Sequence, residues 1–394
     1  MRIAYLTQSY PPMVSGVAIV AQRLAEGMAA RNHTVLVIAA SDRGEPYMAF
    51  KNNFLLLRLR SVVNSFRVRQ RLLVYPRHAI MKALRDFEPD IIHTHDMLQI
   101  GRLGSVYGRS MKVPVVSTLH QVPWFVLPYL PNIPGLRSGA EAALWQYARW
   151  FVRQYAAITA PTQMISNLIS EMTEVLPCTI SNGVDLKTFR PSTLSSKMKP
   201  VLRERFGIPP SVPIILHVGR LDVDKHVERV ILASAQAMMN NPNAHLLIVG
   251  DGYEKPSLIR LCASFGITER CHFPGFISVQ DGLPDIYRIA TLFITASEIE
   301  TQGIVLLEAA ASGLPIVATR ATCIPEIVQD GVNGYLAKPG NVNKLSEAVI
   351  DLLENPRKAK AMGVVGRRLI EQHDLQNTMD AHEELYQRLT SFIK

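Results

Sequence analysis

Two glutamates stand eight positions apart in a segment that is otherwise mostly apolar. Glu308 is the one charged residue in the run 304–311, whose other members are Ile, Val, Leu and Ala. A helix that is apolar on every side is a buried helix, and a carboxylate inside it is costly unless a partner hydrogen-bonds to it. Glu300 comes just before Gly303, at the expected start of this helix. The spacing favours a ligand held by both carboxylates, and pairing of Glu308 with a core Arg or Lys is the alternative.

The segment 297–303 links an expected strand, 291–295, to this helix. Free backbone N–H groups and the helix dipole at residues 302–304 would hold a phosphate. Glu300 is then placed to accept hydrogen bonds from a sugar near that phosphate. Glu308 lies more than one turn inside the helix, where it would accept from the two hydroxyls of a ribose.

Positive charge follows the first expected strand of the second half, 213–219. Arg220 and Lys225 fall in the loop after this strand and at the start of the next helix. Two cations there can neutralise a diphosphate without a metal ion. An ordinary solvated pair is the alternative for any single Arg and Lys.

Gly16 lies between the first expected strand, 2–8, and the first helix, 17–30. A glycine at a helix start lets the backbone approach a phosphate closely, and a plain loop glycine is the alternative. The loop has no G-x-G-x-x-G pattern, so a nicotinamide cofactor loses its main support. We predict no cofactor.

Three histidines end two expected strands of the first half. His120 follows the strand 114–119, where it would hydrogen-bond a sugar, act as a general acid or base, or serve a purely structural role. His93 and His95 end the strand 90–94. Their spacing resembles a metal site, yet no third or fourth ligand stands out, so a structural or acceptor-side role is favoured and no metal is predicted.

Basic and large apolar residues alternate between positions 57 and 77, a pattern that suits a membrane interface. The loop 121–131 is aromatic and proline-rich, and it would line an acceptor site or enter lipid. A solvated basic face beside a buried loop is the alternative, and nucleic acid is not expected because no binding motif accompanies the charge. The candidate acceptor or membrane residues are Arg58, Arg60, Arg67, Arg69, Arg71, Trp124 and Phe125, with Arg77 nearby.

The 394 residues are too many for one ordinary core, and their net charge of +9 is unevenly spread. Residues 1–190 carry 21 Lys and Arg against 11 Asp and Glu, whereas the rest carry 21 against 22. The first half therefore suits an anionic partner. With four cysteines, no signal-peptide pattern and no bilayer-length apolar run, we expect a cytoplasmic protein that is at most peripherally bound to the inner face of the membrane.

Short apolar runs alternate with amphipathic helical stretches along the whole chain, which predicts an α/β fold with two parallel doubly wound sheets. Ligands of such sheets bind beyond the carboxyl ends of the strands, so the candidates should face a cleft between two Rossmann-like domains. The predicted divisions are a first Rossmann-like domain, 1–190, a second, 191–372, and a C-terminal helix, 373–394, that packs back toward the first domain.

These motifs resemble those of the family 4 retaining glycosyltransferases of the GT-B fold, over nearly the whole chain. The most specific part is the two-glutamate motif, 297–303 followed by 308–315. The segments 219–221 with Lys225, 181–185 and 249–252 also match, in order and spacing. Two departures are Ser15, where a glycine pair is common, and His226, where glycine usually follows the lysine.

The resemblance implies that domain 1–190 binds the acceptor and domain 191–372 binds the nucleotide sugar. It also implies that Arg220 and Lys225 bind the donor diphosphate, Glu308 the ribose and Glu300 the transferred sugar. His120 would touch that sugar near the reaction centre. Backbone N–H groups would come from the start of the second-domain helix, and Gly16 would approach the pyrophosphate. The predicted donor-binding residues are Gly16, Arg220, Lys225, Glu300, Gln302, Gly303, Ile304, Val305 and Glu308, and the predicted catalytic residues are His120, Arg220, Lys225 and Glu300.

We therefore expect a metal-independent retaining glycosyltransferase that moves a hexose from a UDP- or GDP-sugar to an acceptor and gives an alpha-glycoside. The basic first half favours a membrane lipid such as diacylglycerol or a phospholipid, and a soluble glycan or small metabolite is the alternative. A GT-B sugar-nucleotide epimerase, a cofactor-dependent phosphorylase and a non-catalytic sugar-nucleotide or lipid-binding module are the rivals. The base, the sugar, the acceptor, the linkage and the oligomeric state stay open.

Overall fold

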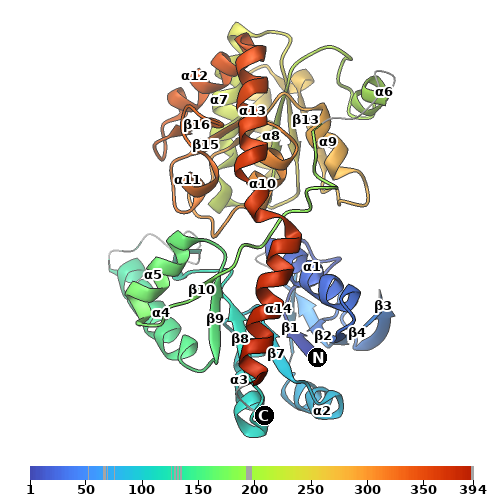
Figure 1. Cartoon of the computed structure of the whole chain (residues 1–394). Coiled ribbons are helices and arrows are strands. Elements are labelled where there is room, and N and C mark those ends of the chain that lie inside the picture. The colour runs from blue at the N-terminus through green and yellow to red at the C-terminus, as the bar shows by residue number, and fades with distance from the viewer. Residues whose placement is uncertain are drawn as a thin grey trace. The chain divides into compact units, whose positions relative to one another are not determined.

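The computed structural model describes residues 1–51, 53–64, 68, 70–74, 76–125, 127, 130, 133, 135–191 and 198–391. The chain forms two compact units, both of α/β architecture (Figure 1). Unit 1 comprises Met1–Asn182 and Gln376–Lys394, and unit 2 comprises Gly183–Leu375. The division falls before the expected boundary at residue 190. Val184 bonds through its backbone to His373 and Leu375, and Phe189 lies in the core of unit 2.

Unit 1 is built on an eight-stranded sheet with the order β10-β9-β8-β7-β1-β2-β4-β3. All described pairs are parallel except β3 with β4, which is antiparallel. The strands are β1 (Arg2–Leu6), β2 (Thr34–Ala40), β3 (Tyr47–Lys51), β4 (Phe54–Leu59), β7 (Ile91–Thr94), β8 (Val115–Thr118), β9 (Ala157–Ala160) and β10 (Cys178–Thr179), and β5 (Ser61–Val63) and β6 (Arg71–Leu73) form a separate hairpin.

Helices cover both faces of this sheet, which explains why its central strands β7, β1 and β2 are almost wholly buried. The C-terminal helix α14 (Leu375–Ser391) lies beside α1 (Figure 1), where a Cβ on Gly27 would stand 2.4 Å from the Met379 sulfur. The other helices are α1 (Gly16–Ala30), α2 (Arg77–Phe87), α3 (Gln99–Met111), η1 (Pro123–Phe125), α4 (Leu136–Val152) and α5 (Gln163–Thr173).

Unit 2 has a six-stranded sheet with the order β13-β12-β11-β14-β15-β16, and its described pairs are all parallel. Its strands are β11 (Ile214–Val218), β12 (His245–Val249), β13 (Cys271–Gly275), β14 (Leu292–Thr295), β15 (Ile316–Thr319) and β16 (Gly334–Ala337). Its helices are α6 (Met198–Glu204), η3 (Val223–Lys225), α7 (Val227–Asn240), α8 (Lys255–Ser264), η4 (Thr268–Arg270), α9 (Leu283–Ile289), α10 (Ile304–Ala311), α11 (Ile324–Ile327), α12 (Val342–Glu354), α13 (Pro356–Leu369) and η5 (Glu371–His373).

Two hydrophobic clusters lie on opposite faces of the unit 2 sheet. Side chains of α9 and α10 pack into one cluster, and side chains of α7, α8 and α12 pack into the other. Both sheets are thus doubly wound, as predicted. Among the described residues, no helix combines the length and the apolar character needed to cross a bilayer.

The order of elements agrees with the sequence pattern, with two differences in unit 1. The sequence pattern of residues 72–86 predicts one amphipathic helix, but the first of these residues belong to β6 and α2 begins only at Arg77. Pro76 precedes the helix, and proline is unfavourable inside one. The antiparallel strand β3 and the hairpin β5–β6 had no clear alternation of apolar and polar residues to reveal them.

Candidate functional site

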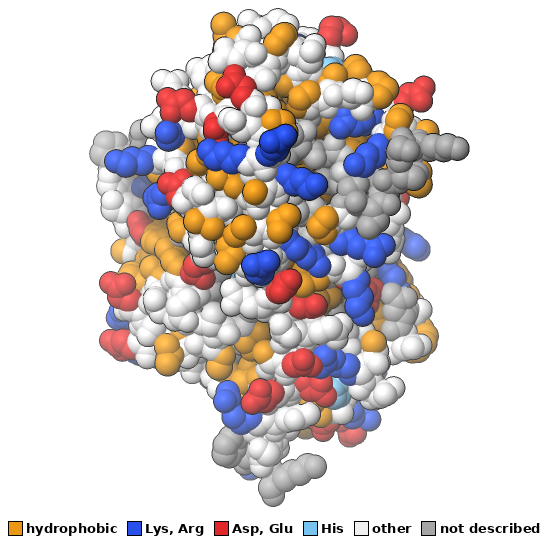
Figure 2. Space-filling model, turned by 45° about the horizontal axis from the view of Figure 1, so that its top comes forward, with side chains coloured by type: hydrophobic (Ala, Val, Ile, Leu, Met, Phe, Trp, Pro, Cys, Tyr) orange, Lys and Arg blue, Asp and Glu red, His pale blue; other side chains and the backbone are white. Residues whose placement is uncertain are grey.

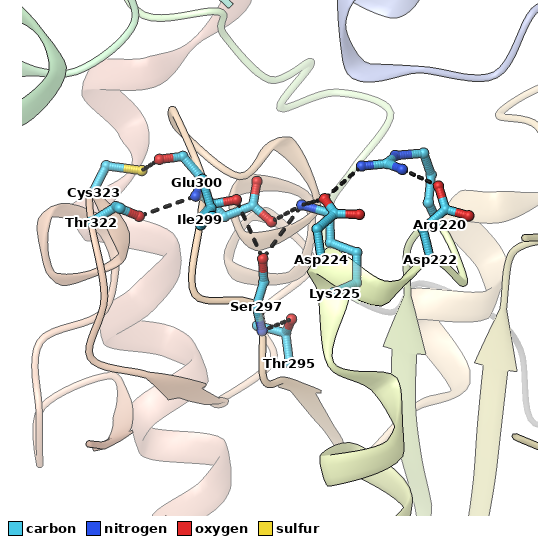
Figure 3. Close-up of polar contacts among 10 residues, drawn as sticks. All are labelled: Arg220, Asp222, Asp224, Lys225, Thr295, Ser297, Ile299, Glu300, Thr322 and Cys323. Atoms are coloured by element: carbon cyan, nitrogen blue, oxygen red, sulfur yellow. Dashed lines mark hydrogen bonds and ion pairs between the residues drawn. The ribbon is translucent and has the colours of Figure 1, made fainter. Parts of the chain in front are cut away.

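The carboxyl ends of β11 and β14 bring two loops of unit 2 together. These strands are neighbours in the sheet, so the residues that follow them meet at one edge. Arg220 and Lys225 come from the loop after β11, and Glu300 comes from the loop after β14 (Figure 3). The sequence placed Arg220 and Lys225 on one motif and Glu300 on another, and the fold brings the two motifs together.

Each of the two cations already contacts carboxylates. Lys225 Nζ lies 2.6 Å from Glu300 Oε1 and 3.9 Å from Asp224 Oδ2. Arg220 donates to Asp222 and, at 2.8 Å, to Asp224 Oδ2. The exposed fractions of the Arg220 and Lys225 side chains are only 19% and 13%, so the alternative of a freely solvated pair is wrong. These carboxylates therefore hold both cations in place.

Glycines fix the path of the Arg220 loop. A Cβ on Gly250 would stand 1.8 Å from the Gly219 carbonyl oxygen, and one on Gly252 would stand 2.1 Å from the Leu221 carbonyl oxygen. Two backbone hydrogen bonds join the same segments: the Gly219 N–H donates to the Val249 carbonyl, and the Leu221 N–H donates to the Asp251 carbonyl. The segment 249–252 therefore supports the Arg220 loop by a backbone-to-backbone contact that only glycine allows.

Glu308 is buried in α10, with an exposed fraction of 2%. The Tyr287 hydroxyl of α9 donates to its Oε2 at 3.2 Å. Gly303 precedes the helix with a φ of +75°, a left-handed conformation that favours glycine. The first N–H groups of α10, which include those of Ile304 and Val305, have no acceptor within the helix and point toward its N-terminal end. This geometry suits an anionic group.

Unit 1 places Gly16 at the first position of α1 and explains the departure at Ser15. Ser15 is the N-cap of this helix, and its Oγ accepts a hydrogen bond from the Ala18 N–H at 3.1 Å. A serine is among the best N-cap residues. The serine at position 15 therefore caps the helix that begins at Gly16.

His120 belongs to a buried cluster of four histidines in unit 1. His120 Nε2 lies 2.9 Å from His95 Nδ1, and the rings of His95 and His93 stack 4.5 Å apart. His382 of α14 stacks on His93 at 5.5 Å. Burial, with a contribution from His382, lowers the pKa of His120 to about 3. His120 is therefore neutral near pH 7, which fits a hydrogen-bonding partner better than a general acid.

His93 has a structural role, as the sequence favoured. Its Nδ1 lies 2.5 Å from the Tyr386 hydroxyl and its Nε2 lies 2.7 Å from Thr118 Oγ1. Burial lowers the pKa of both His93 and His95 well below the usual range. No group of three or more metal-binding side chains occurs within the described part of the chain.

The predicted surface role of Arg58 is wrong. Its side chain is buried, with an exposed fraction of 1%. It donates to the backbone carbonyls of Ala40, at 2.7 Å, and of Pro11. Arg58 lies on the interior strand β4 and donates to carbonyls at the end of β2 and in the loop after β1, instead of meeting an anionic surface.

The other candidates for the acceptor or membrane fall into three groups. Arg60 is exposed and pairs with Glu45 at 2.8 Å. Arg71 is half-buried and donates to Ser61 Oγ at 2.8 Å. Trp124 packs edge-on against Trp145 and donates to Glu141 at 2.7 Å. Arg67, Arg69 and the side chain of Phe125 lie outside the described residues.

Several residues of the site were not singled out from the sequence. Asp222 and Asp224 form ion pairs with Arg220. The only indication of this in the sequence is that both residues closely follow Arg220. Tyr287 gave no signal, because it lies in a helix that looked purely structural. Thr322 and Cys323 contact the backbone of Glu300, and nothing in their spacing links them to it.

Comparisons with known proteins agree with this architecture. Residues 14–188 match the model described as Glycosyltransferase Family 4, and residues 198–369 match that described as Glycosyl transferases group 1. The alpha-monoglucosyldiacylglycerol synthase of Acholeplasma laidlawii is 27% identical, over 93% of this chain and 91% of its own length. The N-acetyl-alpha-D-glucosaminyl L-malate synthase of Bacillus anthracis is 26% identical, over 95% and 94%.

Solved structures show the fold. Anabaena Alr3699/HepE in complex with UDP and glucose superposes with a TM-score of 0.76 at 20% identity, over 98% of this chain and all of the other. The sucrose-phosphate synthase of Thermosynechococcus elongatus superposes with a TM-score of 0.80 at 20% identity, over 99% of both chains. Because the two family matches follow one another and together span most of the sequence, this chain belongs to the GT-B glycosyltransferases that join a Family 4 domain to a group 1 domain.

Proposed function

We propose that this glycosyltransferase moves a hexose from a UDP- or GDP-sugar to a membrane lipid, such as diacylglycerol or a phospholipid, with retention of the anomeric configuration. The observation that carries the donor half is the meeting of Arg220, Lys225 and Glu300 at one sheet edge of unit 2. The same edge of the sheet thus holds two cations that would bind a diphosphate and a carboxylate that would accept hydrogen bonds from sugar hydroxyls.

In this proposal the donor replaces contacts that already exist. Hydroxyl groups of the sugar donate hydrogen bonds to the Glu300 carboxylate. Lys225 then loses its contact with Glu300 and binds the phosphates instead. The N-terminal N–H groups of α10 face the same anion. Glu308 binds the ribose, with Tyr287 holding one of its oxygens. The site therefore exchanges internal ion pairs for contacts with the donor.

The chemical step needs stabilisation of the leaving diphosphate. No described side chain is assigned as a covalent nucleophile, so we propose a front-side attack in which the leaving diphosphate accepts the proton of the acceptor hydroxyl. Arg220, Lys225 and the start of α10 stabilise the growing negative charge, which is electrostatic catalysis by fixed groups. These groups supply the positive charge that a bound metal would otherwise give, so we propose a reaction without one.

The acceptor proposal rests on the relatives and on the surface of unit 1. Besides the Acholeplasma enzyme, an alpha-monoglucosyldiacylglycerol synthase of Streptococcus pneumoniae is 26% identical over 85% of this chain and 75% of its own length. Met48 and Phe50 of β3 are 60% and 75% exposed, next to the exposed cation Lys51. On the face of the chain shown in Figure 2, basic, acidic and hydrophobic side chains all reach the surface. Exposed apolar side chains beside a cation, as on β3, suit peripheral contact with an anionic bilayer.

A soluble acceptor is the second candidate. The malate-glucosaminylating relative covers this chain as fully as the lipid-glycosylating ones do. The epimerase alternative loses support, because both domain matches are to glycosyltransferases.

A donor and acceptor panel tests the proposal. UDP-glucose, UDP-galactose and GDP-mannose are each supplied with diacylglycerol in phosphatidylglycerol vesicles, with phosphatidylinositol vesicles, or with malate and soluble glycans. We expect release of nucleoside diphosphate that depends on lipid, and a product with an alpha linkage by NMR. Turnover on soluble acceptors alone, or a beta-linked product, would contradict the proposal.

A further inference from the structure

Two residues that follow β15, Thr322 and Cys323, contact the loop that carries Glu300 on the side away from Lys225 (Figure 3). The Glu300 N–H donates to Thr322 Oγ1 at 3.1 Å, and the Cys323 thiol donates to the Glu300 carbonyl oxygen at 3.2 Å. These two hydrogen bonds hold both polar groups of the Glu300 backbone, its N–H and its carbonyl oxygen.

Thr322 adopts an unfavourable conformation to make these contacts. Its φ is +41°, in the left-handed region that β-branched residues rarely enter. Strain of this kind persists only where the surroundings over-determine it, and it gathers at functional sites. A glycine would relieve the strain at once but would leave the Glu300 N–H without the Thr322 hydroxyl.

Cys323 is suited to donate a hydrogen bond and not to react. Its side chain is buried, with an exposed fraction of 0%. Burial first, and then the nearby carboxylates of Glu300 and Glu326, raise the pKa of this thiol well above its usual range. The thiol therefore keeps its proton at physiological pH and remains a donor to the Glu300 carbonyl.

We propose that Thr322 and Cys323 are positioning residues that aim the Glu300 carboxylate. Fixing both backbone groups of Glu300 fixes the direction of its Cα–Cβ bond, and the side chain then meets Lys225 Nζ at 2.6 Å. The inference rests on the proposed function, in which Glu300 contacts the transferred sugar. It predicts that the clamp formed by Thr322 and Cys323 matters for turnover and not for binding of the nucleotide.

Substitutions at Thr322 test the clamp. Thr322→Gly removes both the strain and the hydroxyl, whereas Thr322→Ser keeps the hydroxyl. We expect Thr322→Gly to lower kcat about ten- to a hundredfold, the range in which small misplacements of catalytic groups fall. The calorimetric Kd for UDP or GDP, whichever the wild-type enzyme binds, should stay within about twofold, and Thr322→Ser should keep most of the wild-type kcat.

A matched control separates positioning from strain relief. Lys112 is an exposed residue of unit 1 that ends α3 with a φ of +56°. Lys112→Gly removes similar backbone strain far along the chain from Glu300, and it should leave kcat unchanged. If Thr322→Gly does not fold, Cys323→Ser and Cys323→Ala carry the test, because the first keeps a donor and the second does not. Serine should then give the higher kcat, with equal binding of the nucleotide.

The outcomes are distinct. A Thr322→Gly enzyme with wild-type kcat, or with kcat and nucleotide affinity lowered together, overturns the clamp while the proposed function stands. A wild-type enzyme that transfers sugar from none of the donors overturns the proposed function, and the role of the clamp falls with it.

Discussion

At the scale of single residues, the site is a set of paired charges in which the negative charges outnumber the positive ones. Arg220 and Lys225 carry two positive charges, and Asp222, Asp224 and Glu300 carry three negative ones. A site with this balance does not attract a diphosphate by net charge alone. In the proposed function the donor therefore displaces a carboxylate, and Glu300 is the one that a sugar hydroxyl can engage.

Glu300→Gln should separate nucleotide binding from turnover. The amide keeps the size of the side chain but no longer neutralises Lys225, so we expect UDP or GDP to bind as tightly as before or more tightly. Turnover should fall by about 10²- to 10³-fold, as for the loss of one preorganised electrostatic contact. Calorimetric titration and initial-rate measurements check both parts. Full turnover in this variant would remove Glu300 from the reaction.

Some of these residues were visible in the sequence and others were not. Glu308 stood out because one charge on an apolar helix is an energetic anomaly that no tertiary knowledge is needed to notice. Arg58 misled because a cation flanked by leucines looks like a snorkelling surface residue, whereas its guanidinium serves buried carbonyls. Thr322 was invisible, because its importance lies in a backbone angle and in a contact across 22 positions.

At the scale of elements, the histidine cluster joins β7, the loops after β7 and β8, and α14 into one buried layer. Its four rings are held neutral in the folded protein. The pKa of His382 is lowered to about 4 and that of His120 to about 3, in both cases chiefly by burial. An unfolded histidine has a pKa of about 6.5. The unfolded chain therefore takes up more protons below that pH.

Stability should consequently fall as the pH drops from about 6.5 toward 4. The contribution of each buried histidine is fully present above its unfolded pKa, and it is lost at up to about 1.4 kcal/mol per pH unit below it. Asp96, whose pKa burial raises to about 6, opposes this trend as one group against four. Thermal unfolding between pH 7.5 and 4.5 should show the decline.

A substitution in the cluster should flatten this pH profile. His382→Leu removes one titrating ring whose Nε2 has no partner among the described residues. The exposed His78 of α2 offers a control, and His78→Gln should leave the profile unchanged. Equal slopes for His382→Leu and wild type would show that the cluster does not set acid stability.

The contact between the Arg220 loop and the segment 249–252 should be intolerant of a side chain. Gly252→Ala places a methyl group against the Leu221 carbonyl, so we expect a loss of about 1 to 3 kcal/mol in the free energy of unfolding and weaker nucleotide binding. Gly139→Ala in α4 is the control. A Cβ there meets nothing within 4 Å, and alanine should stabilise the helix by up to about 1 kcal/mol. Urea unfolding and nucleotide titration measure both effects.

At the scale of the whole molecule, alternation of apolar runs and amphipathic stretches was enough to predict two doubly wound sheets. Period and burial are properties of short segments, so they survive in the sequence. The exact end of unit 1 could not be predicted as well from the sequence. Val184 pairs with His373 and Leu375 through the backbone, a contact between segments far apart in the chain that no local pattern reports.

The proposed membrane contact belongs to the surface of unit 1, and substitution of the exposed apolar residues of β3 is expected to weaken it. The double substitution of Met48 and Phe50 by serine removes side chains that are 60% and 75% exposed and costs little core packing. We expect the wild-type enzyme to float with phosphatidylglycerol vesicles at low salt and less so at high salt, since the flanking cations are screened. The double variant should float several-fold less at every salt concentration.

The control for this experiment is Met239→Ser in unit 2, which removes an apolar side chain that is 82% exposed. If exposure of methionine alone drove flotation, this variant would lose as much binding as the β3 variant. If β3 faces the bilayer, Met239→Ser floats like the wild type, and the β3 variant keeps its turnover on lipid dispersed in detergent while losing it on vesicles. A β3 variant that floats and turns over normally on vesicles would place the lipid elsewhere on the molecule, because removal of two large exposed apolar side chains cannot be neutral at a surface that enters lipid.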